Sequence, residues 1–382
     1  MRVLVRQLIS VAFLLAVSAC GVDNSVAPTL VPTATPTFRP VGAVATFTPT
    51  ATKIPESPSE ARDTPTPTNT PVVVAPKTNT PSANGTPTAG GTVAPTALSQ
   101  PTAQATPSFT VFGTLGAGDG EIARPRGIAI GADGIYVVER GNSRLQKFSL
   151  QGAWQWRSGS NGAGDGQLSA PAGIALLNNR VYIADTDNRR VAVFAASNGA
   201  FVKNIGQGGK DENELQAPVG IAFDSVGKMF VADSANKRVQ VYERDESPVR
   251  MIAGGGGRED SFGVLGPGGI VVAADDTVWA SDPSNHRIML FDFKGKFFAE
   301  VTSPSDVKNK METPMGLALD AKGRIYVADA ASRQIFVFNA NGGVESIRNA
   351  GDLLLEPTYV AVDPNGWIYV TDATTLRVVV IR

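Results

Sequence analysis

Short apolar runs follow one another from residue 109 to residue 382. β-branched and aromatic side chains dominate these runs, and Gly, Asp and Asn separate them, which is typical of strands joined by tight turns. In one representative unit the expected strands are GIAF at 220–223, MFVA at 229–232, RVQVY at 238–242 and VRMIA at 249–253. No stretch has the sustained periodicity of an amphipathic helix. The pattern predicts an all-β domain.

A unit of four such strands recurs six times along the chain. A proline opens each copy, and consecutive prolines stand 43 to 49 residues apart. An acidic residue follows the second strand of every copy, and Arg or Gln comes five residues after it. These pairs are Glu139 and Arg144, Asp185 and Arg190, Asp233 and Arg238, Asp282 and Arg287, Asp329 and Gln334, and Asp372 and Arg377. Four short strands in a unit of this length predict a propeller blade, so the repeat predicts a six-bladed β-propeller.

The repeated phrases resemble those of a known family. The pattern P-x-G-I/L-A, then I/V-Y-V-A-D, then N-x-R-V/I-x-V-F/Y, is similar to the NHL repeat, and the similarity extends over 109–382. This resemblance implies a propeller, most often six-bladed, that serves as a binding platform.

The two ends of the repeat region predict how the ring closes. The sixth unit stops at Arg382, directly after its third strand, so one strand is missing there. At the other end, FTVFGTL at 109–115 precedes the first proline. We expect 109–115 to complete the sixth blade, because this pairing leaves no open strand edge between the first and last blades.

The start of the chain reads as a targeting segment. Two arginines precede an apolar run at 8–17, which is too short to span a bilayer as a helix. The phrase Val-Ser-Ala before Cys20 resembles a bacterial lipobox, which implies cleavage before Cys20 and a lipid on that cysteine. We therefore expect a signal peptide at 1–19 and a lipid anchor at 20–25, which would hold the protein to the extracytoplasmic side of a bacterial membrane. The alternative is an ordinary secreted protein with an incidental cysteine.

Residues 26–108 differ from the rest in composition. Of these 83 residues, 16 are Pro and 20 are Thr. Such a segment cannot bury enough apolar surface to offset its ordering entropy. We expect a disordered Thr/Pro-rich stalk that holds the propeller away from the membrane.

Composition limits the chemistry. The chain has one histidine, His286, and one cysteine, so a metal site built on His or Cys ligands and a disulfide within the chain are not expected. The residues from 109 onward carry 28 basic and 31 acidic side chains, which gives no basic face for nucleic acid. We expect no cofactor and no metal.

The repeated acid and arginine allow two interpretations. In the structural interpretation Asp185, Asp233, Asp282, Asp329 and Asp372 bind nearby backbone amides and the arginines, and so fix each turn. In the functional interpretation the arginines surround one mouth of the ring and contact a ligand. Positions that break the repeat are then the better candidates, including His286 and Tyr359. The candidate ligand face comprises Glu139, Arg144, Arg190, Arg238, His286, Arg287, Gln334, Tyr359 and Arg377.

These observations favour a cell-envelope lipoprotein whose propeller binds a protein, peptide or glycan without catalysing a reaction. The alternative is a calcium-dependent hydrolase. The resemblance to six-bladed propellers also includes lactonases, which hold a central calcium ion with Glu, Asn and Asp side chains. A structural spacer in an envelope assembly is a third interpretation. Tightly held calcium would distinguish the hydrolase from the other two.

Overall fold

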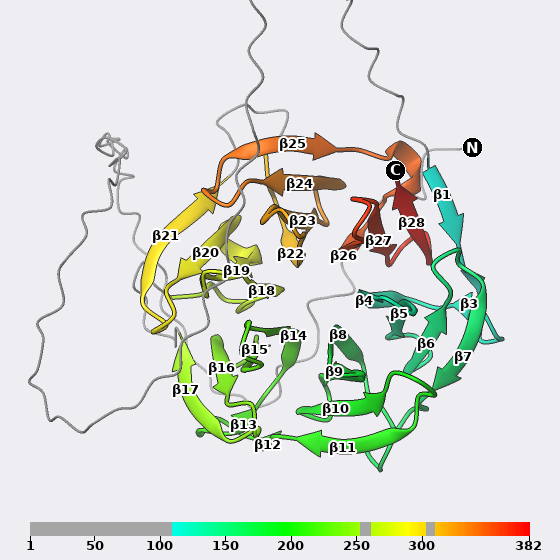
Figure 1. Ribbon diagram of the computed structural model, residues 1–382, viewed down its shortest axis with the longest axis horizontal. Coiled ribbons are helices and arrows are strands. Elements are labelled where there is room, and N and C mark those ends of the chain that lie inside the picture. The colour runs from blue at the N-terminus through cyan, green and yellow to red at the C-terminus, as the bar shows by residue number, and fades with distance from the viewer. Residues whose placement is uncertain (1–108, 253–260, 303–309) are drawn as a thin grey trace, which may run out of the picture. The chain divides into compact units, whose positions relative to one another are not determined.

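Six four-stranded antiparallel sheets form a closed ring in the computed structural model of the chain (Figure 1). The structure describes residues 109–252, 261–302 and 310–382. The predicted signal peptide, Cys20 and the Thr/Pro-rich stalk lie outside the described residues. The predicted all-β, six-bladed fold is confirmed.

Five blades take their strands in chain order from the centre to the rim, and the sixth takes its rim strand from the start of the domain. The first three blades comprise β4 (Pro125–Gly131), β5 (Gly134–Glu139), β6 (Arg144–Phe148) and β7 (Trp154–Ser158); β8 (Pro171–Leu177), β9 (Arg180–Asp185), β10 (Arg190–Ala195) and β11 (Phe201–Ile205); β14 (Pro218–Phe223), β15 (Met229–Asp233), β16 (Arg238–Tyr242) and β17 (Pro248–Ile252). The others comprise β18 (Ile270–Val272), β19 (Val278–Asp282), β20 (Arg287–Phe291) and β21 (Phe297–Thr302); β22 (Pro314–Leu319), β23 (Ile325–Asp329), β24 (Gln334–Phe338) and β25 (Val344–Arg348); β26 (Pro357–Val362), β27 (Ile368–Asp372), β28 (Arg377–Ile381) and β1 (Phe109–Phe112).

The ring closes between the two ends of the repeat region. Strand β1 pairs antiparallel with β28, with Phe109 opposite Ile381 and Phe112 opposite Val378. The predicted closure is thus confirmed, although the closing strand is shorter than expected. Gly113 turns the backbone at φ +86°, and β2 (Thr114–Leu115) then pairs in parallel with β3 (Glu121–Ile122). A second parallel pair, β12 (Gln207–Gly208) with β13 (Glu214–Leu215), occupies the corresponding loop before β14.

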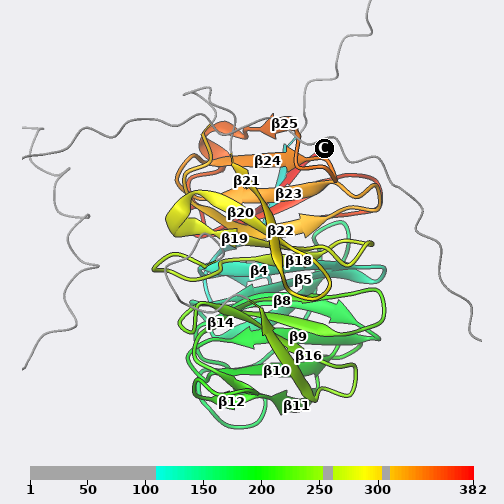
Figure 2. The same ribbon diagram turned by 90° about the vertical axis from the view of Figure 1, so that its left-hand side faces the viewer.

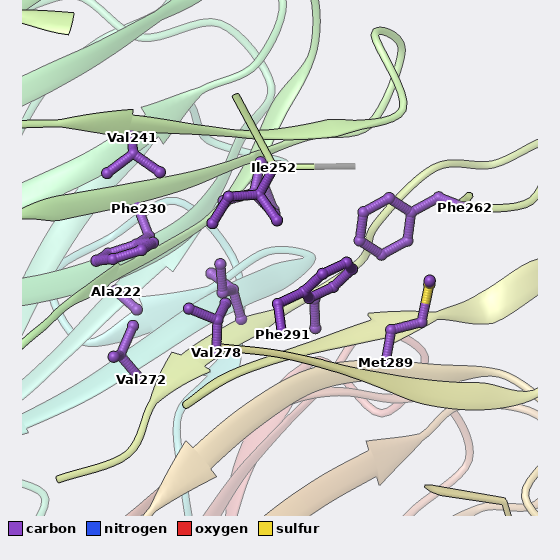
Figure 3. Close-up of a cluster of buried hydrophobic side chains, with 13 residues drawn as sticks. Ala222, Phe230, Val241, Ile252, Phe262, Val272, Val278, Met289 and Phe291 are labelled. Carbon is purple, nitrogen blue, oxygen red and sulfur yellow. The ribbon is translucent and has the colours of Figure 1, made fainter. Parts of the chain in front are cut away.

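Apolar side chains fill the spaces between neighbouring blades. Figure 3 shows the cluster between the third and fourth blades, where Phe230 and Ile252 face Val278 and Phe291. Fully burying one such side chain stabilises the fold by about 1.5–3 kcal/mol. Because every blade packs against two others, these interblade layers, rather than a single central core, hold the ring together. Figure 2 shows the ring edge-on, with β24 and β25 near one end of the view and β11 and β12 near the other.

The turns of each blade divide between the two faces of the ring. The turns between second and third strands lie on the same face as the loops that enter each first strand, as the backbone bonds from Arg140 N to Arg124 O (3.0 Å) and from Ser234 N to Ala217 O (2.9 Å) show. We call this face the mouth face. Helical structure in the described ranges is confined to the short 3-10 turns η1 (Pro283–Asn285) and η3 (Gly351–Leu353). In that part of the chain no helix is long and apolar enough to cross a bilayer.

Candidate binding face and central channel

The turn between second and third strands has the same backbone form in all six blades. The residue just before the repeated Arg or Gln has a positive φ in each copy, between +49° and +60°. These residues are Ser143, Arg189, Lys237, His286, Arg333 and Leu376. Non-glycine residues rarely adopt this conformation, so something must hold each turn.

The repeated acid stabilises the turn through hydrogen bonds to its carboxylate. Asp233 is fully buried, and its Oδ1 accepts hydrogen bonds from the amides of Gln216 (3.0 Å) and Ala217 (2.9 Å). Its Oδ2 accepts one from Asn236 Nδ2 at 2.6 Å. Each carboxylate therefore joins the turn to the loop that enters the first strand of the same blade. All six repeated acids are fully buried: Glu139, Asp185, Asp233, Asp282, Asp329 and Asp372.

The repeated arginine joins the same two segments a second time. Arg190 Nε donates to Asp185 Oδ2 at 2.8 Å, and its terminal nitrogens donate to the carbonyls of Ala163 (2.9 Å), Gly164 (3.0 Å) and Gln167 (2.9 Å). Burial raises the pKa of Asp185 against the opposing hydrogen bonds of the Ser169 amide, Asn188 and Arg190. The pair therefore carries a desolvation cost, and its effect is to fix loop geometry. We call this acid–arginine arrangement the staple.

The staple is complete in four blades and incomplete in two. Arg144 and Arg238 repeat the contacts to three loop carbonyls, and Arg287 binds Asp282, Glu300 and the Ser261 carbonyl. In the fifth blade Gln334 replaces the arginine, and its buried Oε1 has no partner among the described residues. In the sixth, Arg377 Nε donates to the Thr375 carbonyl (3.2 Å) instead of to Asp372.

The structure thus places the predicted ligand-face residues in different surroundings. Glu139 is buried and accepts from Arg144 (2.6 Å), Asn142 (2.6 Å), Gln146 (2.7 Å) and the Ala123 amide (2.9 Å). The stapled arginines point their guanidinium groups at loop carbonyls. Direct ligand contact by these residues stays a prediction.

His286 is exposed, and its Nδ1 contacts the Glu312 carbonyl oxygen of the loop that enters β22. The histidine therefore connects the turn of the fourth blade to the loop of the fifth. Its role in ligand binding also stays a prediction.

Tyr359 fills the centre of the mouth face. Five blades have glycine at this position of the first strand, and these glycines allow neighbouring first strands to approach closely; a Cβ on Gly173 would lie 2.4 Å from the Val219 carbonyl oxygen. In the sixth blade Tyr359 packs against Gly316, and its hydroxyl donates to the Val219 carbonyl of the third blade. It is 8% exposed. Burial raises the pKa of Tyr359 to about 12, so the hydroxyl keeps its proton at neutral pH. Because the side chain reaches from the sixth blade to the third, it closes the channel at this end.

The channel beyond Tyr359 is lined by first strands of all six blades. Its cavity measures about 310 Å³, and its side chains are apolar, among them Ile130, Ile174, Val272, Leu319 and Val362. Across the described ranges no group of three or more His, Cys, Asp or Glu side chains is placed to hold a metal ion. The side chains that line this channel therefore provide no set of ligands for a central calcium ion.

Two exposed features of the mouth face were missed by the sequence analysis. Val264 (80% exposed) and Leu265 (62%) form the tip of a tight turn closed by a bond from Gly266 N to Gly263 O at 3.0 Å. The second feature is a group of three arginines in the first blade, Arg124, Arg126 and Arg140. Aligning the six copies reveals the arginines, because five copies have no basic residue at those three positions. No comparable signal exists for Val264 and Leu265, which lie in a loop that varies between copies.

Comparisons with known proteins agree with this architecture. The NHL repeat family matches residues 168–194, a range that contains the staple of the second blade. Protein brain tumor of Drosophila melanogaster is 26% identical over 36% of this chain, and B-box type zinc finger protein ncl-1 of Caenorhabditis elegans is 24% identical over 36%. The matched region spans only 13% and 16% of the length of these relatives.

Solved structures show the same fold at low sequence identity. A protein of unknown function from Bacteroides thetaiotaomicron superposes with a TM-score of 0.58 at 16% identity, over 72% of this chain and 76% of its own. A catalytically inactive virginiamycin B lyase from Staphylococcus aureus, solved with quinupristin, gives 0.53 at 12% identity, over 72% and 99%. At these identities the similarity concerns the fold alone. The chain is a six-bladed β-propeller that carries an NHL repeat.

Proposed function

We propose that this protein is a cell-envelope lipoprotein, anchored by a lipid on Cys20, whose NHL-type propeller binds a protein, peptide or glycan without catalysis. One observation carries the proposal: Tyr359 closes the channel at the mouth face, and stapled loops surround it. Among the described residues, the mouth face therefore offers stapled loops around a filled channel instead of a deep reactive cavity. Fixed loops suit recognition, because little conformational entropy is lost when a partner binds.

The exposed turn at Val264 and Leu265 supports the choice of this face. Its backbone is held in place, since the Leu265 amide donates to Ser284 Oγ at 2.9 Å. A rigid, exposed apolar tip is the kind of feature that anchors a protein partner. We expect this tip to enter an apolar pocket of the partner.

Partner capture with matched variants tests the proposal. The tagged full-length chain is cross-linked in its own cells and compared with Val264→Asp/Leu265→Asp. The control, Leu150→Asp/Val226→Asp, changes two other exposed apolar residues, 39% and 62% exposed, in turns that join first to second or third to fourth strands. A partner recovered with the wild type and the control but lost with the mouth-face variant supports the proposal. Equal recovery with both variants contradicts the choice of face.

Two further measurements test the anchor and the hydrolase alternative. Cys20→Ser should abolish incorporation of a labelled fatty acid and release the protein from the membrane fraction; unchanged labelling would refute the anchor. Chelation of calcium should leave the melting temperature unchanged, because a tightly bound ion stabilises the native state by mass action and its removal lowers stability. A large loss of stability on chelation would favour the hydrolase.

A further inference from the structure

Three arginines of the first blade gather where the mouth face meets the closed channel. Arg124 precedes β4, Arg126 is its second residue, and Arg140 follows β5. Strands β4 and β5 pair with Pro125 opposite Glu139, and the Arg140 amide donates to the Arg124 carbonyl at 3.0 Å. The backbone thus brings all three to one corner. Arg126 lies against the sixth blade, where Thr371 Oγ1 donates to its carbonyl at 2.5 Å.

These arginines differ from the stapled ones in having no protein partner. In the described part of the chain none of the three guanidinium groups makes a hydrogen bond or an ion pair. Arg124 and Arg140 are exposed, whereas Arg126 is half-buried and its Nε is buried without a partner. A buried donor left unsatisfied is costly, so an incoming acceptor would gain from binding it.

The local charge points the same way. Although Arg140 is exposed overall, partial desolvation of its side chain lowers its pKa, and the positive charges of Arg126 and Arg124 lower it further, while Asp187 of the second blade opposes the shift. Three like charges beside one carboxylate leave a net positive corner on a domain whose overall balance is slightly acidic. Arginine forks bind carboxylates through parallel hydrogen bonds, which makes an oxyanion the matching ligand group.

Resting on the proposed function, we propose that Arg124, Arg126 and Arg140 bind a carboxylate group of the partner, presented by an acidic peptide segment. The surrounding loops favour a single anionic group over a nucleic-acid chain. They carry Asp211, Glu212, Glu312 and Glu356, which would repel a continuous phosphate backbone. The site is thus a compact positive corner that matches a short acidic segment, whereas the acidic residues of the other mouth-face loops would repel a long phosphate backbone.

Direct binding of a defined probe tests this assignment. A fluorescent tetraglutamate peptide is titrated with the full-length chain, with tetraglutamine as the uncharged comparison. The variant Arg124→Gln/Arg126→Gln/Arg140→Gln is matched by Lys294→Gln/Lys296→Gln/Lys322→Gln, which removes the same charge from exposed lysines in turns away from the mouth face. The first variant should weaken tetraglutamate binding about tenfold or more, and the second less than about twofold.

A substitution that should tighten binding distinguishes loss of the site from misfolding. Asp187→Asn removes the carboxylate that competes for Arg140, so it should tighten tetraglutamate binding by about two- to threefold. Loss of binding in the arginine variant with its melting temperature retained, together with tighter binding in Asp187→Asn, establishes the site.

Three results would overturn the assignment. The first is a loss of the expected charge dependence: the wild type fails to bind tetraglutamate, or both charge variants bind it equally. The second is stronger competition by inorganic phosphate than by acetate, which assigns the site to phosphoryl groups. The third is preferential, arginine-dependent binding of a single-stranded oligonucleotide. In each case partner capture through Val264 and Leu265 is unaffected, so the proposed function is judged separately.

Discussion

Two sets of arginines occupy the same face of this propeller and differ in almost every physical respect. Arg190 and its stapled equivalents recur with the repeat, lie mostly buried and bind a carboxylate and loop carbonyls. Arg124, Arg126 and Arg140 occur in one blade and have no side-chain partner among the described residues. A residue present in every blade thus builds the blade, whereas an exposed residue that departs from the repeat leaves its side chain accessible to solvent.

The largest expected difference between the two sets concerns stability. Arg238→Ala leaves the fully buried Asp233 carboxylate without its charge partner and frees three loop carbonyls, so it should cost about 3–5 kcal/mol. Arg140→Ala removes a side chain that has no partner in the described part of the chain, and it should change stability by less than about 0.5 kcal/mol. Urea unfolding of both variants checks this, and equal losses would end the distinction between the two sets.

Tyr359 offers the next test, because it departs from the repeat yet is buried. Tyr359→Gly restores the glycine of the other blades but leaves empty the space that the tyrosine side chain fills. The change should lower the free energy of unfolding by about 3–5 kcal/mol. Thermal and urea unfolding measure the loss. Tyr359→Phe separates the hydroxyl bond to Val219 from the packing and should cost about 1 kcal/mol. A stable Tyr359→Gly variant would mean that the channel needs no closure.

Completing a missing staple should have a smaller effect of opposite sign. Gln334→Arg supplies the arginine that the fifth blade lacks, next to the buried Asp329. We expect a gain of about 1.5–3 kcal/mol at most, the value of a hydrogen bond to a charged group, measured by urea unfolding. Gln334→Lys is the control, since its single ammonium cannot form the same fork. A gain from lysine equal to that from arginine would show that charge alone matters.

The smallest expected effect is on the pH dependence of stability. It distinguishes Asp185, a stapled acid, from Asp320, which lies in a turn between first and second strands. Burial raises the folded pKa of Asp185 above 3.8, so its contribution to stability is present below that value and is lost as pH rises through the folded pKa. Burial also acts on Asp320, but the amides of Arg324 and Lys322 and the Arg324 guanidinium outweigh it and lower the pKa. Its contribution is present above 3.8 and is lost as pH falls through the lowered pKa.

Asp185→Asn and Asp320→Asn should therefore change the pH dependence in opposite directions. Urea unfolding between about pH 3 and pH 7 should show the wild-type advantage over Asp185→Asn falling as pH rises and the advantage over Asp320→Asn growing as pH rises. Parallel profiles would contradict the opposite signs.

Much of the fold was predictable because the same unit recurs six times at nearly regular spacing. The recurring proline, acid and arginine located the strands. The missing last strand of the sixth unit predicted that 109–115 would close the ring, and Phe109–Phe112 does so. The end of that strand was not predictable, because Gly113 could equally continue a strand or turn the chain. Asp233 accepts hydrogen bonds from the backbone amides of Gln216 and Ala217, which is the kind of contact that the structural interpretation of the repeated acids describes.

The candidate site was less predictable, because it depends on residues from different blades. That Tyr359 breaks the repeat is visible in the sequence, but only the ring places its hydroxyl on Val219, three blades away. The exposure of Val264 and Leu265 likewise depends on how their loop packs.

The number of blades, their strand order and the way the ring closes follow from the sequence alone, because hydrophobic periodicity and turn residues act locally and recur six times. Which polar groups find partners depends instead on the folded ring. The guanidinium groups of Arg190 and Arg140 are chemically identical, and one meets loop carbonyls while the other meets none among the described residues. The difference lies in the loops that the ring brings alongside each side chain, and local sequence carries no record of that placement.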